Sequence, residues 1–574
     1  MKRNKLLTTV AGVATLAITL TACGSKAPEQ GGDTKKLDGD LTNKATEVIK
    51  AEDASKNPDA AKNRKDTIVI GIDAPDGIFN PAYHESQYDR YVADSMFAYI
   101  SYVKHDGTLE DGLGVIKPSE DGLSYTITLK DGVKWSDGTP ITTDDLEFSF
   151  FVRADKAYDG PSDISALKIK GLNAYHDGTS DKIEGIEKVD AKTLKVTLEE
   201  VNASAIYDIG NFQPLPKAFY GQHYKQGEGD KLQAVHRTPE LFSGPYKLKE
   251  YKEGQSVILE ANENFFQGKA KIPNLIYKVT NKNTAMQLLE TGEVDINALT
   301  VSTENVSQIK SKGFLDQHIY PTNGYGYMAF NHRKEALKDV KVRQAIAHAL
   351  NREAIVQNVY KGYANVINIP QSKVSWAYTD DVDKYEFDKE KANSLLDEAG
   401  WKKGSDGIRE KDGNKLSIKF LASTPNEVND AILAIAKGDF KEVGIEFLPE
   451  QMDFNTVRAK VKQKDGDYDM YFMAWGLTPD PDPTTIFKTG GSQNEIGYSN
   501  AKVDELISKG LKATKQEDRK VIYQDMYKEL NKDLPYIFVY QRRDMWVVNS
   551  RIKNVDVSPY RDFTIDLGKY EIEQ

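Results

Sequence analysis

The sequence predicts a mixed α/β protein built from more than one domain. An apolar run at 67–72 and an alternating apolar and polar run at 124–129 indicate strands, and apolar residues at helical spacing follow them along most of the chain. The chain has 574 residues, well beyond the ~250–300 at which a single hydrophobic core stops growing. Apolar residues make up 39% and aromatic residues 10% of the chain, enough to form several cores and to line a pocket.

Caps and turns place the individual elements. Thr142 with Asp144 and Asp145 is typical of a helix start, because a hydroxyl caps the first turn and carboxylates favour its positive end. Asn283 is expected to cap a second helix that Gly292 ends. The same apolar spacing predicts helices at 342–349, 392–399 and 522–530. Apolar runs predict strands at 294–296, 468–475 and 536–540, and a Pro- and Asp-rich loop follows at 478–483.

The N-terminus carries the pattern of an export signal. Basic residues precede an apolar run at 6–20, which is shorter than the ~20 residues of a permanent membrane span. The sequence Leu20-Thr21-Ala22-Cys23 resembles the lipobox of bacterial lipoproteins, in which the acylated cysteine becomes the mature N-terminus. An ordinary signal with an incidental Cys23 is the alternative. We expect a signal peptide at 1–22 and a lipid-anchored protein on the extracytoplasmic face of the cell membrane of a Gram-positive bacterium.

The segment after the anchor is expected to be a flexible tether. Residues 24–65 are polar and charged, with too few apolar side chains for a core. A short helix around 42–51 is conceivable within it. Cys23 is the single cysteine of the chain, so no intrachain disulfide stabilises the exported body, and its size has to supply the stability.

Charge and motif content exclude several functions. A net charge of −11 argues against binding to a nucleic-acid backbone. The eight histidines form no His-Glu-x-x-His pattern, and His348 in a helical segment is expected to be packed or solvated. There is no Gly-x-Ser-x-Gly elbow, no nucleophilic cysteine and no phosphate-binding Gly-rich loop. We therefore predict neither cofactor nor metal and no enzymatic activity; an extracellular hydrolase, the competing class, would need a nucleophile or metal site.

Seven blocks of sequence stand out along the chain: 119–146 (SEDGLSYTITLKDGVKWSDGTPITTDDL), 243–248 (SGPYKL), 262–266 (NENFF), 288–295 (LLETGEVD), 339–346 (DVKVRQAI), 395–401 (LLDEAGW), and Trp475 with 480–483 (DPDP). In content and order these blocks resemble family 5 extracellular solute-binding proteins, the oligopeptide- and dipeptide-binding subunits of ABC importers. Within the first block we expect the glycines to serve turns and Trp135 to fill a core.

The resemblance implies a two-lobed periplasmic-binding-protein-like clamshell with an extra domain on the first lobe, the cluster C type. Such proteins close on their ligand by hinge rotation. Mapped onto this sequence, the expected divisions are a tether at 23–65, lobe one at 66–325 completed by 541–574, an extra domain at 101–240 within it, and lobe two at 326–540.

The resemblance also implies the ligand and its contacts. An oligopeptide or dipeptide would be held through its backbone and its charged ends, with an acid for the α-ammonium shortly after Trp475. The position three residues after Trp475 is Thr478, so Asp480 is the first candidate and Asp482 the second. Alternatively, one of these carboxylates caps a helix start near 484–485. Trp475 and Tyr471 are expected to line a side-chain pocket.

The implied partners are the permease subunits of an ABC transporter and the membrane, the latter through the lipid, with the protein itself a monomer. The family also includes receptors for signalling peptides and binders of nickel complexes, haem and oligosaccharides. Nickel would need ligand donors that the scattered histidines do not obviously supply.

Overall fold

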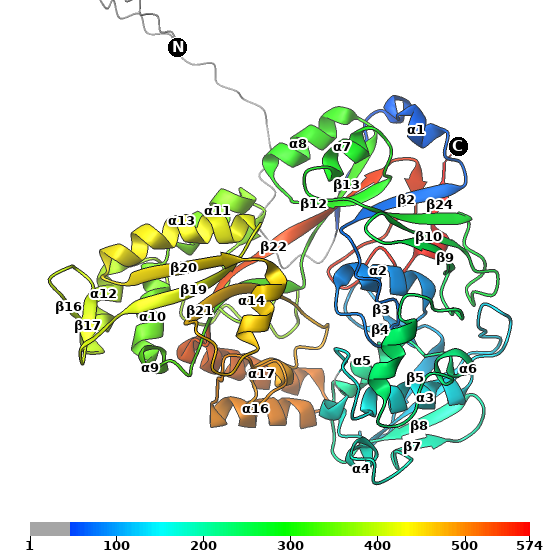
Figure 1. Ribbon diagram of the computed structural model, residues 1–574, viewed down its shortest axis with the longest axis horizontal. Coiled ribbons are helices and arrows are strands. Elements are labelled where there is room, and N and C mark those ends of the chain that lie inside the picture. Colours follow the sequence, from blue (N-terminus) through cyan, green and yellow to red (C-terminus); the bar gives the residue numbers. More distant parts are fainter. Residues whose placement is uncertain (1–45, 163, 574) are drawn as a thin grey trace, which may run out of the picture. The chain divides into compact units, whose positions relative to one another are not determined.

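The computed structural model describes residues 46–162 and 164–573 and has a mixed α/β fold (Figure 1). The signal peptide, Cys23 and the first part of the expected tether lie outside these residues. The largest sheet has 13 strands. In sheet order they are β20 (Glu446–Met452), β19 (Ser417–Ser423), β21 (Met470–Gly476), β14 (Gly324–Phe330), β22 (Tyr536–Asn549), β12 (Ile296–Leu299), β2 (Thr67–Ile72), β11 (Asn274–Val279), β10 (Ser256–Ala261) and β9 (Tyr246–Lys252), with β1 (Glu47–Ile49), β13 (Leu315–Pro321) and β15 (Ala364–Asn365) off this path.

Strand β22 belongs to both parts of this sheet. Its first residues pair with β14, and its later residues pair with β12 and β13. A bulge interrupts the pairing with β14 near its end, because Phe538 lies opposite Tyr327 whereas Tyr540 lies opposite Gly326. A Cβ atom at Gly326 would lie 2.4 Å from the Tyr540 ring, so the close approach at this bulge requires glycine.

The buried side chains form clusters that meet at β22. Trp546 and Val548 belong to a cluster with Ile70 of β2, and Met545 and Val547 belong to a neighbouring one. Earlier in the strand, alternate residues enter two further clusters formed within 325–540. The predicted strand at 536–540 is therefore longer than expected. This distribution of buried residues supports our proposal that the lobes divide near 325 and 540.

The first lobe contains a separate antiparallel sheet of four strands. Helix α3 begins at the predicted Thr142 cap, with a full capping box to Asp145, and Trp135 is buried with its Nε1 donating to Asp145 at 3.4 Å, so both predictions are confirmed. The sheet consists of β5 (Gly114–Pro118), β6 (Ser124–Leu129), β8 (Thr193–Thr197) and β7 (Ile186–Lys188), and the helices of this lobe are α2 (Gln87–Met96), α3 (Thr143–Ala154), α4 (Leu172–His176), α5 (Ala205–Gly210), α6 (Lys217–Tyr220), α7 (Ala285–Glu290) and α8 (Thr303–Lys312).

The cap predicted at Asn283 is wrong. Helix α7 starts after Thr284 without a side-chain cap, because Asn281 accepts hydrogen bonds from the backbone N–H groups of Asn283 and Thr284 in a preceding turn. An Asn side chain in such a turn competes with its use as a helix cap.

Most longer helices of the second lobe begin at an Asn or Asp side chain that accepts a backbone hydrogen bond. The predicted helices at 342–349, 392–399 and 522–530 are confirmed within α10, α12 and α17. His348 contacts the backbone oxygen of Glu386 at 2.8 Å, as expected for a packed histidine. The helices are α9 (Glu335–Lys338), α10 (Val340–Ala349), α11 (Arg352–Tyr360), α12 (Lys389–Glu398), α13 (Glu427–Glu442), α14 (Phe454–Val461), α15 (Thr484–Phe487), α16 (Ala501–Lys512) and α17 (Gln516–Asp533).

The second half of the expected tether is part of the folded body, which corrects the prediction for 46–65. A strand, β1, forms where a helix was conceivable, and it pairs antiparallel with β13. Asp316 of β13 accepts hydrogen bonds from the Ala51 backbone at 2.7 Å and from Lys50 at 2.9 Å. A one-turn helix, α1 (Asp59–Lys62), follows. Composition missed this segment because its order comes from backbone pairing and ion pairs rather than from apolar side chains.

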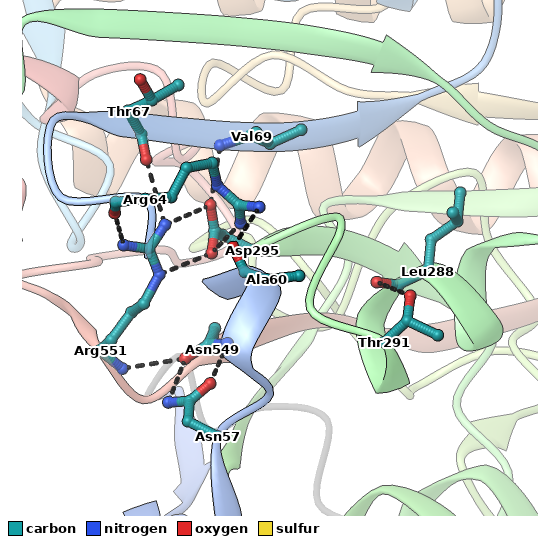
Figure 2. A network of polar contacts seen from close by, with 10 residues as sticks. All are labelled: Asn57, Ala60, Arg64, Thr67, Val69, Leu288, Thr291, Asp295, Asn549 and Arg551. Atoms are coloured by element: carbon teal, nitrogen blue, oxygen red, sulfur yellow. Dashed lines mark hydrogen bonds and ion pairs between the residues drawn. The ribbon is translucent and has the colours of Figure 1, made fainter. Parts of the chain in front are cut away.

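A buried ion triad fastens this segment to the first lobe (Figure 2). Asp295, which is fully buried, accepts hydrogen bonds from Arg64 and Arg551, each at 2.8 Å, and from the Val69 backbone at 2.9 Å. Asn57 and Asn549 exchange two hydrogen bonds beside it. The triad thus joins the N-terminal segment, the start of β12 and the end of β22 around one carboxylate.

Candidate ligand site between the two lobes

The loop after β21 holds two acidic residues in different environments. Asp480 is 5% exposed and forms a two-pronged ion pair with Arg519 of α17, at 2.6 and 2.7 Å. Arg519 also donates to the Gly510 backbone oxygen at 3.0 Å and to the Tyr523 hydroxyl at 3.1 Å. Asp480 is therefore already neutralised by a buried partner on its own lobe.

Asp482, two residues further along the chain, accepts hydrogen bonds through only one of its two carboxylate oxygens. Its Oδ1 accepts hydrogen bonds from the Thr484 backbone at 3.1 Å and from the Thr484 hydroxyl at 2.6 Å, where α15 begins. Among the described residues, Oδ2 has no hydrogen-bond partner. Burial raises the pKa of Asp482 to about 6, against the opposing effect of the Thr484 hydroxyl and with a further increase from the charge of Asp480. One oxygen thus holds the helix start, and the other has no donor within the described part of the chain.

A third carboxylate, Asp208 of α5, approaches these two from the first lobe. Its side chain reaches solvent but is surrounded by protein, and this loss of bulk hydration is the main reason why its pKa rises to about 7. The negative charges of Asp482 and Asp480 raise the pKa further. The lobes also touch near α5, where the Ala203 backbone donates to the Leu511 oxygen at 2.8 Å. No sequence signal distinguishes Asp208 from the other acids of the chain, and the reasoning from sequence missed it.

The two expected aromatic ligand contacts lie in different places. Trp475 at the end of β21 is partly buried and stacks on Tyr327, with ring centroids 6.0 Å apart and an interplanar angle of 4°. Tyr471 is 1% exposed and packs against Tyr327 and Tyr468 inside the core of the second lobe. Trp475 is thus partly exposed, whereas Tyr471 is buried in the core of the second lobe, which contradicts its expected place in a side-chain pocket.

Near β22, further charged and aromatic groups lie where the two lobes meet. Arg90 of α2 pairs with Asp562 at 2.9 Å, and Arg542 pairs with Asp544 at 2.7 Å. Burial raises the pKa of Asp562 to about 6, although the charge of Arg90 opposes this effect. The hydroxyl of Tyr560 donates to the Val374 backbone oxygen at 3.0 Å, from the first lobe to the second. The Tyr560 hydroxyl and the Val374 backbone thus add a polar contact between the lobes.

A comparison with protein-family models identifies the family. Residues 91–497 match the model of bacterial extracellular solute-binding proteins, family 5, middle region. The chain belongs to this family. Members of the solute-binding family bind their ligands without chemical conversion, and this protein is a solute-binding protein rather than an enzyme.

Individual relatives agree with this assignment. The oligopeptide-binding protein AppA of Bacillus subtilis (strain 168) is 28% identical over 524 residues, covering 89% of this chain and 93% of the relative. Heme-binding protein A of Haemophilus influenzae is 26% identical over 458 residues, covering 77% of this chain and 80% of the relative. The solved structure of Bacillus subtilis AppA in complex with a nonapeptide matches with a TM-score of 0.78 and 26% identity, covering 89% of this chain and 99% of that one. The predicted two-lobed α/β architecture is confirmed.

Metal-binding clusters and membrane-spanning helices are both absent from the part of this solute-binding protein that the structure describes. Within residues 46–162 and 164–573, no group of three or more His, Cys, Asp or Glu side chains is placed to hold a metal ion. Among the helices of the same residues, none combines the length and the apolar character needed to cross a membrane.

Proposed function

We propose that this protein captures peptides outside the cytoplasm and delivers them to the permease subunits of an ABC importer. The observation that carries this proposal is the similarity, over nine-tenths of the chain, to an oligopeptide-binding protein whose structure holds a nonapeptide. Polar groups from both lobes at one interface support capture by closure of the lobes.

Attachment to the membrane is the second part of the proposal. Cys23 at the end of the signal-like segment would carry the lipid, and residues up to about 45 would form the tether. The folded body would then begin at β1, which follows directly. The protein would work as a monomer beside its permease, on the outer face of a Gram-positive cell membrane.

We infer that the α-ammonium of the peptide binds between Asp482 and Asp208. The charge of Asp482 raises the pKa of Asp208, and the charge of Asp480 raises the pKa of both. A cation placed between Asp482 and Asp208 would offset this repulsion and stabilise their ionised forms. Asp480, the first candidate from the sequence, is less suitable because Arg519 already compensates its charge. The ligand amine would thus bind one acid from each lobe. Its positive charge would offset the repulsion between Asp482 and Asp208, which opposes closure of the two lobes.

Titration calorimetry with matched free and N-acetylated peptides tests this anchor. Wild type should bind the acetylated peptide ~30-fold to several thousand-fold more weakly, because truncating one partner of a buried charge pair typically costs ~2–5 kcal/mol. In Asp482→Asn this discrimination should shrink. In Asp480→Asn it should persist while thermal stability falls, because Arg519 loses its buried partner. Equal discrimination in wild type and Asp482→Asn would refute the anchor, and no peptide binding at all would refute the proposed function.

The alternative is that the protein binds another class of ligand known in the family. Among these classes, the similarity to a haem-binding relative favours haem. Mass spectrometry of small molecules that co-purify with the folded protein separates these cases. A bound porphyrin, metal complex or oligosaccharide in place of peptides would overturn the assignment of peptides as the ligand. Receptor function for signalling peptides differs in purpose rather than in binding chemistry, and uptake of labelled peptide by intact cells distinguishes it from import.

A further inference from the structure

A cavity of about 460 Å³ lies between the extra domain of the first lobe and the second lobe. Its walls are 165–168 and 200–202 on one side and 484–485, 488–492, 508 and 511–512 on the other. The contact between Ala203 and Leu511 and an ion pair between Lys512 and Glu200 at 3.5 Å join the two sides. The cavity is therefore complete only when the lobes are in contact.

The charge of this cavity is opposite to that of the whole chain. Its titratable residues are three lysines, Lys168, Lys488 and Lys512, and one acid, Glu200. Glu200 pairs with both Lys168 and Lys512, and Lys488 has no ion-pair partner among the described residues. The lining thus carries two uncompensated positive charges in a chain with a net charge of −11. A concave surface of one sign concentrates ligands of the other sign.

The loop beside Lys488 adds backbone donors to this positive charge. Gly490 has a φ of +74°, and a Cβ atom at Gly491 would lie 2.5 Å from the Thr485 oxygen, so the turn depends on glycine. Within the described part of the chain, the backbone N–H groups of Gly490 and Ser492 donate to no protein acceptor. These two groups flank the N–H of Gly491, which donates to the Lys488 oxygen at 2.9 Å. Free backbone N–H groups in a turn can donate to a bound anion.

We propose that this cavity binds an anionic group, a carboxylate or a phosphate. The lysines supply the charge, the glycine loop supplies oriented donors, and the cavity volume exceeds that of a single small anion. Because both lobes form the walls, an anion bound here favours the arrangement in which the lobes touch. The site adjoins the proposed amine anchor, because Thr484, which donates to Asp482, also lines the cavity. It uses other charged groups, since the lining contains neither Asp482 nor Asp208. It also does not depend on the ligand class proposed above.

Calorimetric titration of the whole protein at low ionic strength tests the site, since surface charge effects are screened by salt. The probes are inorganic phosphate and a peptide supplied both as the free acid and as the C-terminal amide. We expect saturable binding of phosphate, or tighter binding of the free acid than of the amide. The first outcome identifies a free anion as the ligand and the second a peptide carboxylate.

The double variant Lys488→Gln/Lys512→Gln should weaken the binding of whichever probe is held by about 10- to 150-fold, the range for loss of a hydrogen bond to a charged group. The matched control is Lys502→Gln on α16, because Lys502 pairs with Glu505 and does not line the cavity. This control should bind as wild type does. The proposal is overturned if wild type shows neither phosphate binding nor a difference between acid and amide. It is equally overturned if the double variant behaves like the control.

Discussion

The Asp295 triad gives the sharpest prediction for stability. Asp295→Asn keeps the shape of the side chain but leaves Arg551, which is 6% exposed, and Arg64, which is 20% exposed, without a counter-charge. Removing one partner of a buried ion pair typically costs ~3–5 kcal/mol, because the remaining charge stays desolvated. Three charge-assisted hydrogen bonds end on this one carboxylate, so we expect the upper part of that range. At ~2–4 °C per kcal/mol for a large domain, a loss of ~4–5 kcal/mol should lower the unfolding temperature of the first lobe by roughly 8–20 °C.

Differential scanning calorimetry of wild type and variant measures this change. Glu253→Gln is the matched control, because Glu253 also forms a two-pronged pair with an arginine, Arg237, at 2.7 and 3.2 Å, but on the surface. Exposed pairs contribute little, so the control should unfold close to wild type. If Asp295→Asn shifted the transition no more than Glu253→Gln does, the triad would not hold the N-terminal segment in the way we describe.

Three further predictions follow from the N-terminal segment and the acid pair. Cys23→Ala should move the protein out of the membrane fraction while peptide binding persists; unchanged partitioning into detergent would disprove the lipid anchor. A chain that starts at residue 66 should unfold at a lower temperature than one that starts at 46, because it lacks β1 and Arg64; equal melting curves would contradict our description of 46–65. Burial and the neighbouring carboxylates raise the pKa of Asp208 to about 7, so its contribution to stability is present below pH ~4 and is lost as the pH rises towards 7. Asp208→Asn should therefore raise the melting temperature relative to wild type more at pH 8 than at pH 5, and a difference that is constant with pH would argue against the acid pair.

Local features of the fold could be predicted where a residue, in its sequence context, has few possible structural roles. The capping box at Thr142 and the buried Trp135 were predictable, because a hydroxyl before two acids and an indole between turns have few other roles. The failed cap at Asn283 shows the limit, since Asn281 two residues earlier offers the same chemistry. The segment at 46–65 could not be predicted, because β1 depends on the free edge of β13, some 270 residues away in sequence.

The candidate site also has features that could be predicted from the sequence and features that could not. The sequence located the loop after Trp475, because an apolar strand ending in prolines and aspartates is distinctive. It could not rank Asp480 and Asp482, since the ranking depends on Arg519, which lies on a helix about forty residues later. Asp208 belongs to the other lobe and became visible only when the fold placed α5 opposite this loop.

The continuity of β22 restricts insertions and deletions in this part of the sequence. Successive residues of this strand point into different hydrophobic clusters. Trp546 and Val548 belong to one cluster, and Met545 and Val547 belong to another. Residues in the first part of the strand belong to the two clusters of the second lobe. Losing or gaining one residue within 536–549 would exchange these faces for the remainder of the strand, and no loop interrupts the strand to absorb the change. Insertions and deletions should thus be absent from this stretch in functional homologues, even at 28% identity, while they accumulate in the loops on either side.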